Sequence, residues 1–157
     1  MVDPFCGCGG NVIQFAKTCG FVIGGDHDIE KIKLCVNNTK VYGLSNNVDY
    51  IVADALYLIK CIRLDVLFLS PPWGGPSYKF EDTFSVEEHL NPNAFEIIKS
   101  LNESCYRVAM FLPKNVSIKP LKKISKKYFD GSLEYEKNQF NKKIVAVTIY
   151  FNKHTNM

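Results

Sequence analysis

Apolar and polar positions alternate along this chain between runs with the period of a β-strand and runs with the period of a helix. The strand-like runs are residues 1–2, 21–25, 49–53, 65–69 and 106–112. The helix-like runs are residues 11–19, 28–42, 55–61, 92–104 and 119–129. Two alternating runs, 132–139 and 144–152, flank residues 141–142 and predict a closing antiparallel hairpin. This order is typical of an α/β domain with a mostly parallel sheet.

The predicted helix over residues 28–42 is expected to bury Ile29, Ile32, Val36 and Val41. The first strand should be central in the sheet, yet only two of its residues are present. A shortened central strand leaves backbone amides of the neighbouring strands unpaired, and each buried unpaired amide costs roughly 1–3 kcal/mol of stability. Either upstream residues are missing from the chain or the domain is weakened there.

Composition narrows the class of protein. The 157 residues, 46% of them apolar and 22% charged, predict one soluble globular domain over residues 1–157. No secretory signal or membrane-length apolar run is present, so no membrane partner is expected. The net charge of +3 permits a polyanionic partner without requiring one. Six cysteines without a CxxC pair indicate reduced thiols of a cytosolic or nuclear protein, with no metal site.

A glycine turn follows the first strand directly. The run is Asp3-Pro4-Phe5-Cys6-Gly7-Cys8-Gly9-Gly10-Asn11. Ligands of open α/β sheets bind beyond the carboxyl ends of the strands, where glycines let the backbone approach them. Val12 stands where a dinucleotide fingerprint has its last glycine, which argues against NAD, and no Gly-Lys-Ser/Thr follows, so the turn is not a P-loop. The turn therefore predicts a site for a nucleoside cofactor.

Three aspartates end successive strands. Asp26 can accept hydrogen bonds from both ribose hydroxyls, Asp54 from an adenine amine, and Asp3 suits the ammonium of the cofactor's amino-acid end. Each could instead be a turn or helix-capping carboxylate. Three in succession favour the cofactor interpretation. The predicted cofactor contacts are Asp3, Phe5, Cys6, Gly7, Gly9, Asn11, Asp26, His27, Asp54, Ala55 and Ser70.

The second distinctive run, Ser70-Pro71-Pro72-Trp73-Gly74-Gly75, opens a loop expected over residues 70–92. Methyl transfer to an exocyclic amine requires strict positioning of the nitrogen lone pair. Ser70 and the Pro71 carbonyl can hold the two N–H groups, and the prolines stiffen the backbone. Trp73 would stack on the base, and a cationic base would gain about 2 kcal/mol if desolvated. With the glycine turn, this loop predicts S-adenosylmethionine-dependent methylation of a base nitrogen, with Ser70, Pro71 and Trp73 as catalytic residues.

The chain resembles the trimethylguanosine synthases, which convert a 7-methylguanosine RNA cap to its 2,2,7-trimethyl form. The matching positions run through residues 2–11, 13–16, 37–38, 41–43, 68–76, 78, 95–97 and 111–113, nearly the whole chain. The resemblance implies the Rossmann-like α/β sheet of the class I S-adenosylmethionine-dependent methyltransferases. It implies S-adenosylmethionine as cofactor and S-adenosylhomocysteine as product. It also implies that Trp73 stacks on the charged 7-methylguanine while Ser70 and Pro71 hold its N2.

The same resemblance implies the remaining substrate contacts, and two departures put part of them in doubt. Asn38 would touch the cap guanosine, Pro72 would border it, and Tyr78 and Lys114 would contact the cap phosphates. Lys114 stands where the family has arginine, so the phosphate grip loses its bidentate geometry. The family's upstream helical extension is also absent from this sequence. We therefore expect the chain alone to bind cofactor and cap weakly or not at all.

The resemblance also indicates partners and place: 7-methylguanosine-capped small nuclear and nucleolar RNAs, in the nucleus, with the cytoplasm left open, and a monomeric protein. Two alternatives stay open. One is an amino-methyltransferase, N2-guanine or other, acting on rRNA, tRNA or DNA. The other is a cofactor- or cap-binding module without turnover.

A row of lysines marks the predicted helix over residues 119–129. Lys119, Lys122, Lys123, Lys126 and Lys127 fall on one stripe, opposite an apolar stripe. Either this face is simply solvated, or it contacts the transcript beyond the cap, because rows of lysines bind phosphates.

Overall fold

The computed structural model describes residues 1–75, 82–101 and 105–153. The strands are β1 (Val2–Asp3), β2 (Val22–Asp26), β3 (Val48–Val52), β4 (Val66–Leu69), β5 (Arg107–Pro113), β6 (Glu134–Phe140) and β7 (Lys143–Asn152). The helices are α1 (Gly10–Ala16), α2 (Ile29–Val41), α3 (Ala55–Cys61), α4 (Ala94–Lys99) and α5 (Ile118–Tyr128), with a 3₁₀ turn η1 (Ser45–Asn47). Strands and helices alternate as the apolar pattern predicts.

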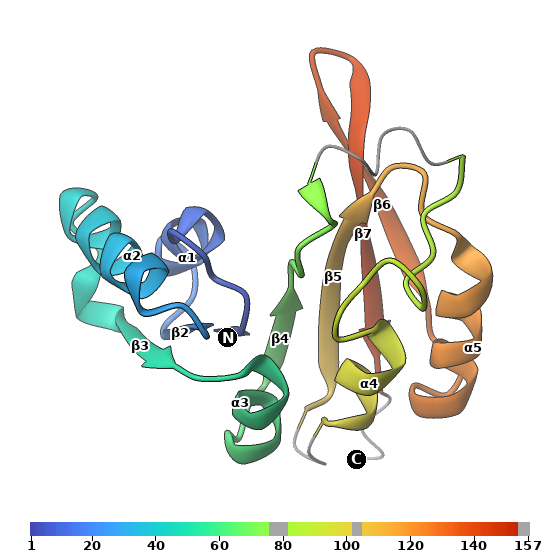
Figure 1. Cartoon of the computed structure of the whole chain (residues 1–157), viewed down its shortest axis with the longest axis horizontal. Coiled ribbons are helices and arrows are strands. Elements are labelled where there is room, and N and C mark those ends of the chain that lie inside the picture. The colour runs from blue at the N-terminus through green and yellow to red at the C-terminus, as the bar shows by residue number, and fades with distance from the viewer. Residues whose placement is uncertain (76–81, 102–104, 154–157) are drawn as a thin grey trace.

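The strands form one sheet in the order β3-β2-β1-β4-β5-β7-β6 (Figure 1). The pairs from β3 to β5 are parallel, whereas β7 pairs antiparallel with both β5 and β6. Asn141 and Lys142 take positive φ angles of 49° and 63° at the hairpin turn. The predicted parallel sheet with a closing hairpin is confirmed.

The central strand β1 has only two residues, as expected. Val2 pairs with Ile23 on one side and with Leu67 on the other, and Asp3 pairs with Gly24. The main-chain carbonyl of Met1 extends the ladder by accepting from Ile23 N–H at 2.9 Å. This short strand delivers the glycine turn to the carboxyl edge of the sheet, where parallel α/β folds bind their ligands.

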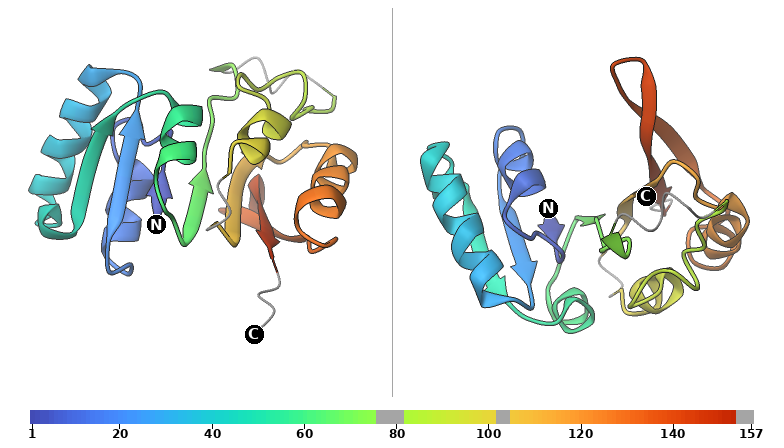
Figure 2. Two further views of the ribbon diagram at one scale, coloured as in Figure 1. Left: turned by 90° about the horizontal axis from the view of Figure 1, so that it is seen from below. Right: turned by 45° about the horizontal axis from the view of Figure 1, so that its top comes forward.

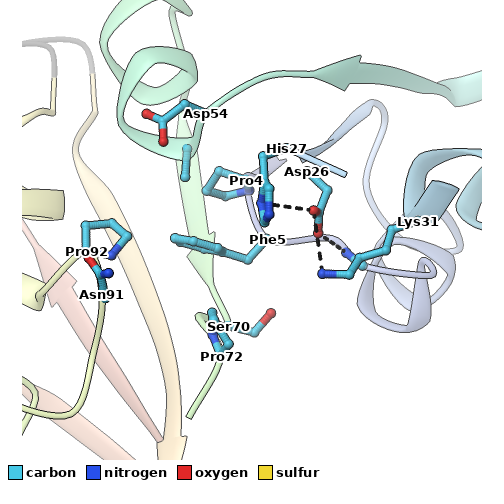
Figure 3. A pocket seen from close by; sticks show the side chains of 12 residues that line it. Pro4, Phe5, Asp26, His27, Lys31, Asp54, Ser70, Pro72, Asn91 and Pro92 are labelled. Atoms are coloured by element: carbon cyan, nitrogen blue, oxygen red, sulfur yellow. Dashed lines mark hydrogen bonds and ion pairs between the residues drawn. The ribbon is translucent and has the colours of Figure 1, made fainter. Parts of the chain in front are cut away.

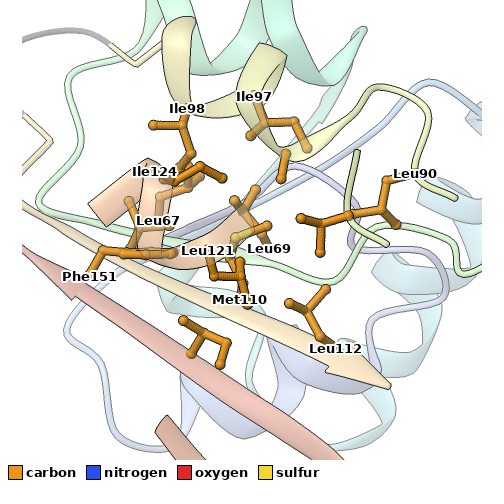
Figure 4. Close-up of a cluster of buried hydrophobic side chains, with 14 of the residues drawn as sticks. Leu67, Leu69, Leu90, Ile97, Ile98, Met110, Leu112, Leu121, Ile124 and Phe151 are labelled. Carbon is orange, nitrogen blue, oxygen red and sulfur yellow. The ribbon is translucent and has the colours of Figure 1, made fainter. Parts of the chain in front are cut away.

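Helices cover the two faces of the sheet unequally (Figure 2). On one face α1 and α2 pack together, and on the other α3 packs against α4 and α4 against α5. Beneath α4 and α5, alternate residues of β5 such as Met110 and Leu112 meet Ile97 and Leu121 in the main core (Figure 4). On the opposite face of β5, Ala109 and Phe111 are only half-buried. That face stays available for the site described below.

Two details of the helices differ from expectation. In α2, Ile29 is 47% exposed and Val41 76%, while Cys35 and Thr39 are buried beside Ile32. Val41 lies off the stripe that faces the sheet, and Ile29 is the first residue of the helix. The inward assignment of Ile29 and Val41 was wrong.

The other difference is length. Helix α1 ends at Ala16, and α4 begins at Ala94 behind a capping box in which Asn93 and Glu96 exchange hydrogen bonds. Residues 102–104 of the predicted helix lie outside the described residues. Within the described part of the chain, no helix is long and apolar enough to cross a membrane.

Candidate active site

A cavity of about 390 Å³ opens at the carboxyl edge of the sheet, beside the ends of β1, β2, β3 and β4 (Figure 3). Its walls bring together eight of the predicted site residues: Phe5, Gly7, Asp26, His27, Asp54, Ala55, Ser70 and Pro72. Residues from four separate strand ends thus converge on one hollow, as the topology of an open parallel sheet requires.

The glycine turn is fixed by Asp26, which is nearly fully buried. Its Oδ2 accepts from the Gly7 N–H at 3.1 Å and its Oδ1 from the Asp28 N–H at 3.0 Å. Gly9 packs the glycine turn closely against Cys35 of α2. Its φ is 90°, and a Cβ at this position would lie only 2.7 Å from the Cys35 Sγ, so both the backbone and the space exclude a side chain. The carboxylate and the turn therefore hold one another in place.

Asp3 lies beneath the turn and does not line the cavity. Its carboxyl is 0% exposed, with Oδ1 accepting from the Phe5 N–H at 3.1 Å. Within the described structure Oδ2 has no hydrogen-bond partner. Burial, with a smaller contribution from the charge of Asp26, raises the pKa of Asp3 from 3.8 to about 7. A buried acceptor without a partner is costly, but this carboxyl does not reach the cavity, so its role toward an ammonium stays a prediction.

Asp54 and His27 both line the cavity and are both exposed. Asp54 caps α3, because its Oδ1 accepts from the Tyr57 N–H at 3.1 Å. The capping and ligand interpretations of this aspartate are therefore compatible. His27 Nδ1 lies 3.4 Å from Asp26 Oδ1, so the imidazole stays beside the carboxylate that ends β2.

Four residues that the sequence did not predict also line this cavity. Lys31 comes from the first turns of α2, with Nζ 3.8 Å from Asp26 Oδ1. Pro4 belongs to the glycine turn, while Asn91 and Pro92 close the opposite wall (Figure 3). The loop over residues 70–92 was expected to be functional, but nothing in its composition singled out its last two residues.

A second cavity, of about 340 Å³, adjoins the first on the half-buried face of β5. The rings of Trp73 and Phe111 stack with centroids 5.4 Å apart and an interplanar angle of 28°. The indole N–H donates to the Phe111 carbonyl at 3.3 Å, which fixes the ring. Trp73 is half-buried and lines the cavity with Asn11, Ser70, Pro71, Pro72, Gly75 and Phe111. The indole is therefore placed beside an open space large enough to receive a flat ring.

The two cavities share walls. Ser70 and Pro72 line both of them. Asn11 Nδ2 donates to Ser70 Oγ at 3.3 Å, which ties the start of α1 to the loop after β4. Groups bound in the two cavities would therefore be neighbours, separated only by the residues that line both cavities.

The structure separates some predicted residues from both cavities. Asn38 does not line either one, and its Nδ2 donates to the Cys8 carbonyl at 2.9 Å. Cys6 is buried against Cys35, which together with burial raises the pKa of its thiol. Lys114 is exposed at the end of β5. Tyr78 lies outside the described residues.

Comparison with known proteins gives this arrangement a family. Residues 1–154 match the family model described as RNA cap guanine-N2 methyltransferase. The chain belongs to the RNA cap guanine-N2 methyltransferases. It is 41% identical to the trimethylguanosine synthase of Schizosaccharomyces pombe over 77% of this chain and 53% of that protein. Its identity with the Saccharomyces cerevisiae trimethylguanosine synthase is 35%, over 81% of this chain and 42% of that protein.

The chain therefore spans about half the length of these two relatives of the cap methyltransferase family. Solved structures show the fold at lower identity. A human protein titled methyltransferase 10 domain containing protein has a TM-score of 0.69 at 15% identity, over 98% of this chain and 71% of its own. TrmN from Thermus thermophilus has a TM-score of 0.63 at 20% identity, over 96% of this chain and 43% of its own. The predicted class I methyltransferase fold is confirmed.

Proposed function

We propose that this chain transfers methyl groups from S-adenosylmethionine to the exocyclic N2 of a 7-methylguanosine RNA cap, giving 2,7-dimethyl and 2,2,7-trimethyl caps. The observation that carries the proposal is the shared wall at Ser70 and Pro72, which places a cavity beside Trp73 next to a cavity lined by two strand-end carboxylates, Asp26 and Asp54. Family membership supports the chemistry.

The first cavity fits the cofactor. Asp26 would accept from the ribose hydroxyls and Asp54 would face the adenine amine. Asp3 lies beneath the turn, and its Oδ2, which has no hydrogen-bond partner within the described structure, would attract the ammonium from below the cavity. His27 and Phe5 would border the nucleoside. When bound, the cofactor supplies an electrophilic methyl carbon on a sulfonium.

The second cavity fits the base. A 7-methylguanine carries a fixed positive charge, and a desolvated cation against an indole gains about 2 kcal/mol over a neutral ring. Trp73 is held for this contact by its stacking on Phe111 and its hydrogen bond to the Phe111 carbonyl. The base would thus lie with its amino edge toward Ser70.

Ser70 and Pro71 would then aim the amine. Hydrogen bonds from the two N–H groups to the Ser70 hydroxyl and the Pro71 carbonyl leave the nitrogen lone pair facing the first cavity. The cofactor held beside Asp26 and Asp54 would supply the methyl to this nitrogen, with its sulfonium sulfur as leaving group and water as acceptor of the displaced proton. No general base is needed for this order of events.

The proposal extends to small nuclear and nucleolar RNAs as capped substrates and to the nucleus as the place of action, supported by the resemblance to trimethylguanosine synthases. Asn38, Tyr78 and Lys114 belong to it as cap contacts. Caps recovered from cells that lack the protein test this part: we expect loss of trimethyl caps on those RNAs. Unchanged caps would contradict it.

The direct test is mass spectrometry of 7-methyl-GTP incubated with S-adenosylmethionine and the chain, with unmethylated GTP as the matched control substrate. We expect addition of one and then two methyl groups to 7-methyl-GTP only, at a low rate because the chain alone is expected to bind cofactor and cap weakly. Equal methylation of GTP would favour an amino-methyltransferase of rRNA, tRNA or DNA. Calorimetric binding of 7-methyl-GTP without any product would show a cap-binding module instead.

A further inference from the structure

Helix α5 presents an unusually uniform charge. Its 11 residues include five lysines and no acidic residue. Leu121 and Ile124 of the same helix are fully buried in the main core, so the lysine stripe faces outward. Its members are Lys119, Lys122, Lys123, Lys126 and Lys127, and we call this set the α5 lysine row. Four of them line a shallow hollow of about 390 Å³ with Ile118.

The described residues do not balance this charge. Among the described residues, no carboxylate forms an ion pair with any lysine of the row. The lysines of α2 differ, because Lys33 pairs with Glu30 at 2.7 Å and Lys31 lies 3.8 Å from Asp26. Five neighbouring positive charges repel one another, and an external anion relieves that repulsion.

The row begins at the same edge of the sheet as the cavity that holds Trp73, but on the other face of β5, where Leu121 and Ile124 pack. Strand β5 carries Phe111 into that cavity and ends at Pro113, and exposed Lys114 follows. Helix α5 starts four residues beyond Lys114, at the same edge of the sheet (Figure 1). Backbone hydrogen bonds from Ser117 N–H to the Phe84 carbonyl at 2.8 Å and from Phe84 N–H to the Asn115 carbonyl at 3.0 Å hold this connection.

From that edge α5 runs back along the sheet for about 16 Å, at 1.5 Å per residue. Lys114 and the α5 lysine row thus carry positive charge from the carboxyl edge of the sheet, where the proposed cap cavity also opens, along the face that α5 covers. A lysine row recognises phosphate by charge and not by geometry, so it suits a flexible strand of any sequence.

We propose that the α5 lysine row binds the phosphates of the single-stranded RNA that follows the cap. The inference rests on the proposed function, because the substrate cap must sit beside Trp73 for its RNA to reach α5. The row then contributes affinity for long transcripts and none for the isolated cap.

The test compares Lys122→Gln/Lys126→Gln with a matched control on another helix, Lys33→Gln/Lys40→Gln, which removes the same charge. Affinity is measured for a capped RNA of about 20 nucleotides, the same RNA without a cap, and a cap dinucleotide, over a range of salt concentrations. Thermal unfolding and circular dichroism confirm that each variant is folded.

We expect the row variant to bind both RNAs at least tenfold more weakly at low salt. The slope of log K against log salt should fall by roughly 1.4, at about 0.7 per lost contact on a single strand. Affinity for the cap dinucleotide and its methylation should not change, and the control variant should resemble the unmodified chain.

Three results would overturn the proposal: unchanged RNA affinity and salt slope, an equal loss for the cap dinucleotide, or an equal effect of the α2 control. Polyglutamate that displaces RNA at equal charge concentration would assign the row to an acidic protein partner instead. Failure of the proposed function is read separately, from methylation of the cap dinucleotide by the unmodified chain.

Discussion

The two cavities that meet at Ser70 are built in different ways. The first is made of carboxylates and a glycine turn that hold one another through backbone hydrogen bonds, with Asp26 bonded to the Gly7 and Asp28 amides. The second is made of rings and prolines, where Trp73 rests on Phe111 and Pro72 is exposed. A polar, internally bonded hollow thus adjoins an apolar shelf.

This difference indicates how each cavity gains its specificity. Side chains already held by hydrogen bonds need little reordering when a ligand arrives, so the first cavity is pre-organised. In the second cavity most of the binding free energy is expected to come from the ring that stacks on Trp73, and rings are discriminated by their charge. The changes below are expected to affect one cavity and spare the other.

The largest effect is expected at Asp3, in the layer beneath the first cavity. Because burial raises the pKa of Asp3 from 3.8 to about 7, the folded protein keeps a proton that the unfolded chain releases over that interval. The free energy of unfolding should therefore fall as the pH rises from about 4 to about 7, by at most roughly 4 kcal/mol. Asp3→Asn should abolish this fall, as measured by urea unfolding at pH 5 and pH 8.

The control for this prediction is Asp65→Asn, which removes an exposed carboxylate and should leave the pH dependence of the unmodified chain intact. An Asp3→Asn variant that is still less stable at pH 8 than at pH 5 by the same amount would show that other groups carry the effect.

The next largest effect is expected at Trp73. Trp73→Ala should weaken binding of 7-methyl-GTP about 100-fold, since stacking on one base contributes roughly 1–3 kcal/mol and the cation adds to it. Calorimetry with S-adenosylmethionine should show unchanged cofactor affinity, because Trp73 does not line the first cavity. The affinity of Trp73→Phe for 7-methyl-GTP should lie between those of the unmodified chain and Trp73→Ala, because the variant keeps a ring. Equal losses for cofactor and cap would mean that the two cavities do not act independently.

A smaller effect is expected where the cavities join. Ser70→Ala removes the acceptor of the Asn11 amide and one proposed acceptor of the N2 amine, so the rate of methyl transfer should fall about tenfold, or about 1.4 kcal/mol. Asn11→Ala should cost less. In the double variant the two losses should fall short of additive by about 1 kcal/mol. Strict additivity of the two losses would argue against a functional contact between Asn11 and Ser70.

The smallest effect is expected at Lys114, which lies outside both cavities, three residues beyond Phe111. Lys114→Arg should tighten binding of a cap dinucleotide a few-fold, because a guanidinium can hold phosphate with two parallel hydrogen bonds. Lys114→Ala should weaken it by a similar factor, and neither should alter binding of the cofactor. Fluorescence titration with the dinucleotide measures both. A tighter complex with alanine would remove Lys114 from the proposed phosphate contacts.

The sequence predicted the strands and the closing hairpin because their apolar runs are long and strongly periodic. It failed on Ile29 and Val41, since apolarity alone does not show that Ile29 begins the helix and that Val41 lies off the stripe of Ile32, Cys35 and Thr39. The strand-end aspartates and the Ser70 loop were predictable because topology alone brings strand ends together. Lys31 and Pro92 were not, because they enter the first cavity from a helix and a distant loop.

Asn38 shows a further limit. The resemblance to the family suggests a cap contact for Asn38 but does not reveal its contact within the chain. There its side-chain amide donates to the Cys8 carbonyl and so holds the glycine turn. Side chains that support a ligand site indirectly are found only when the fold brings their partners close.

The wall that the two cavities share, formed by Ser70 and Pro72, has a practical consequence. A single compound that links an adenosine to an N7-alkylated guanine by a short flexible tether could fill both hollows at once, passing over that wall. Such a bivalent compound would gain effective concentration at its second end without any new contact.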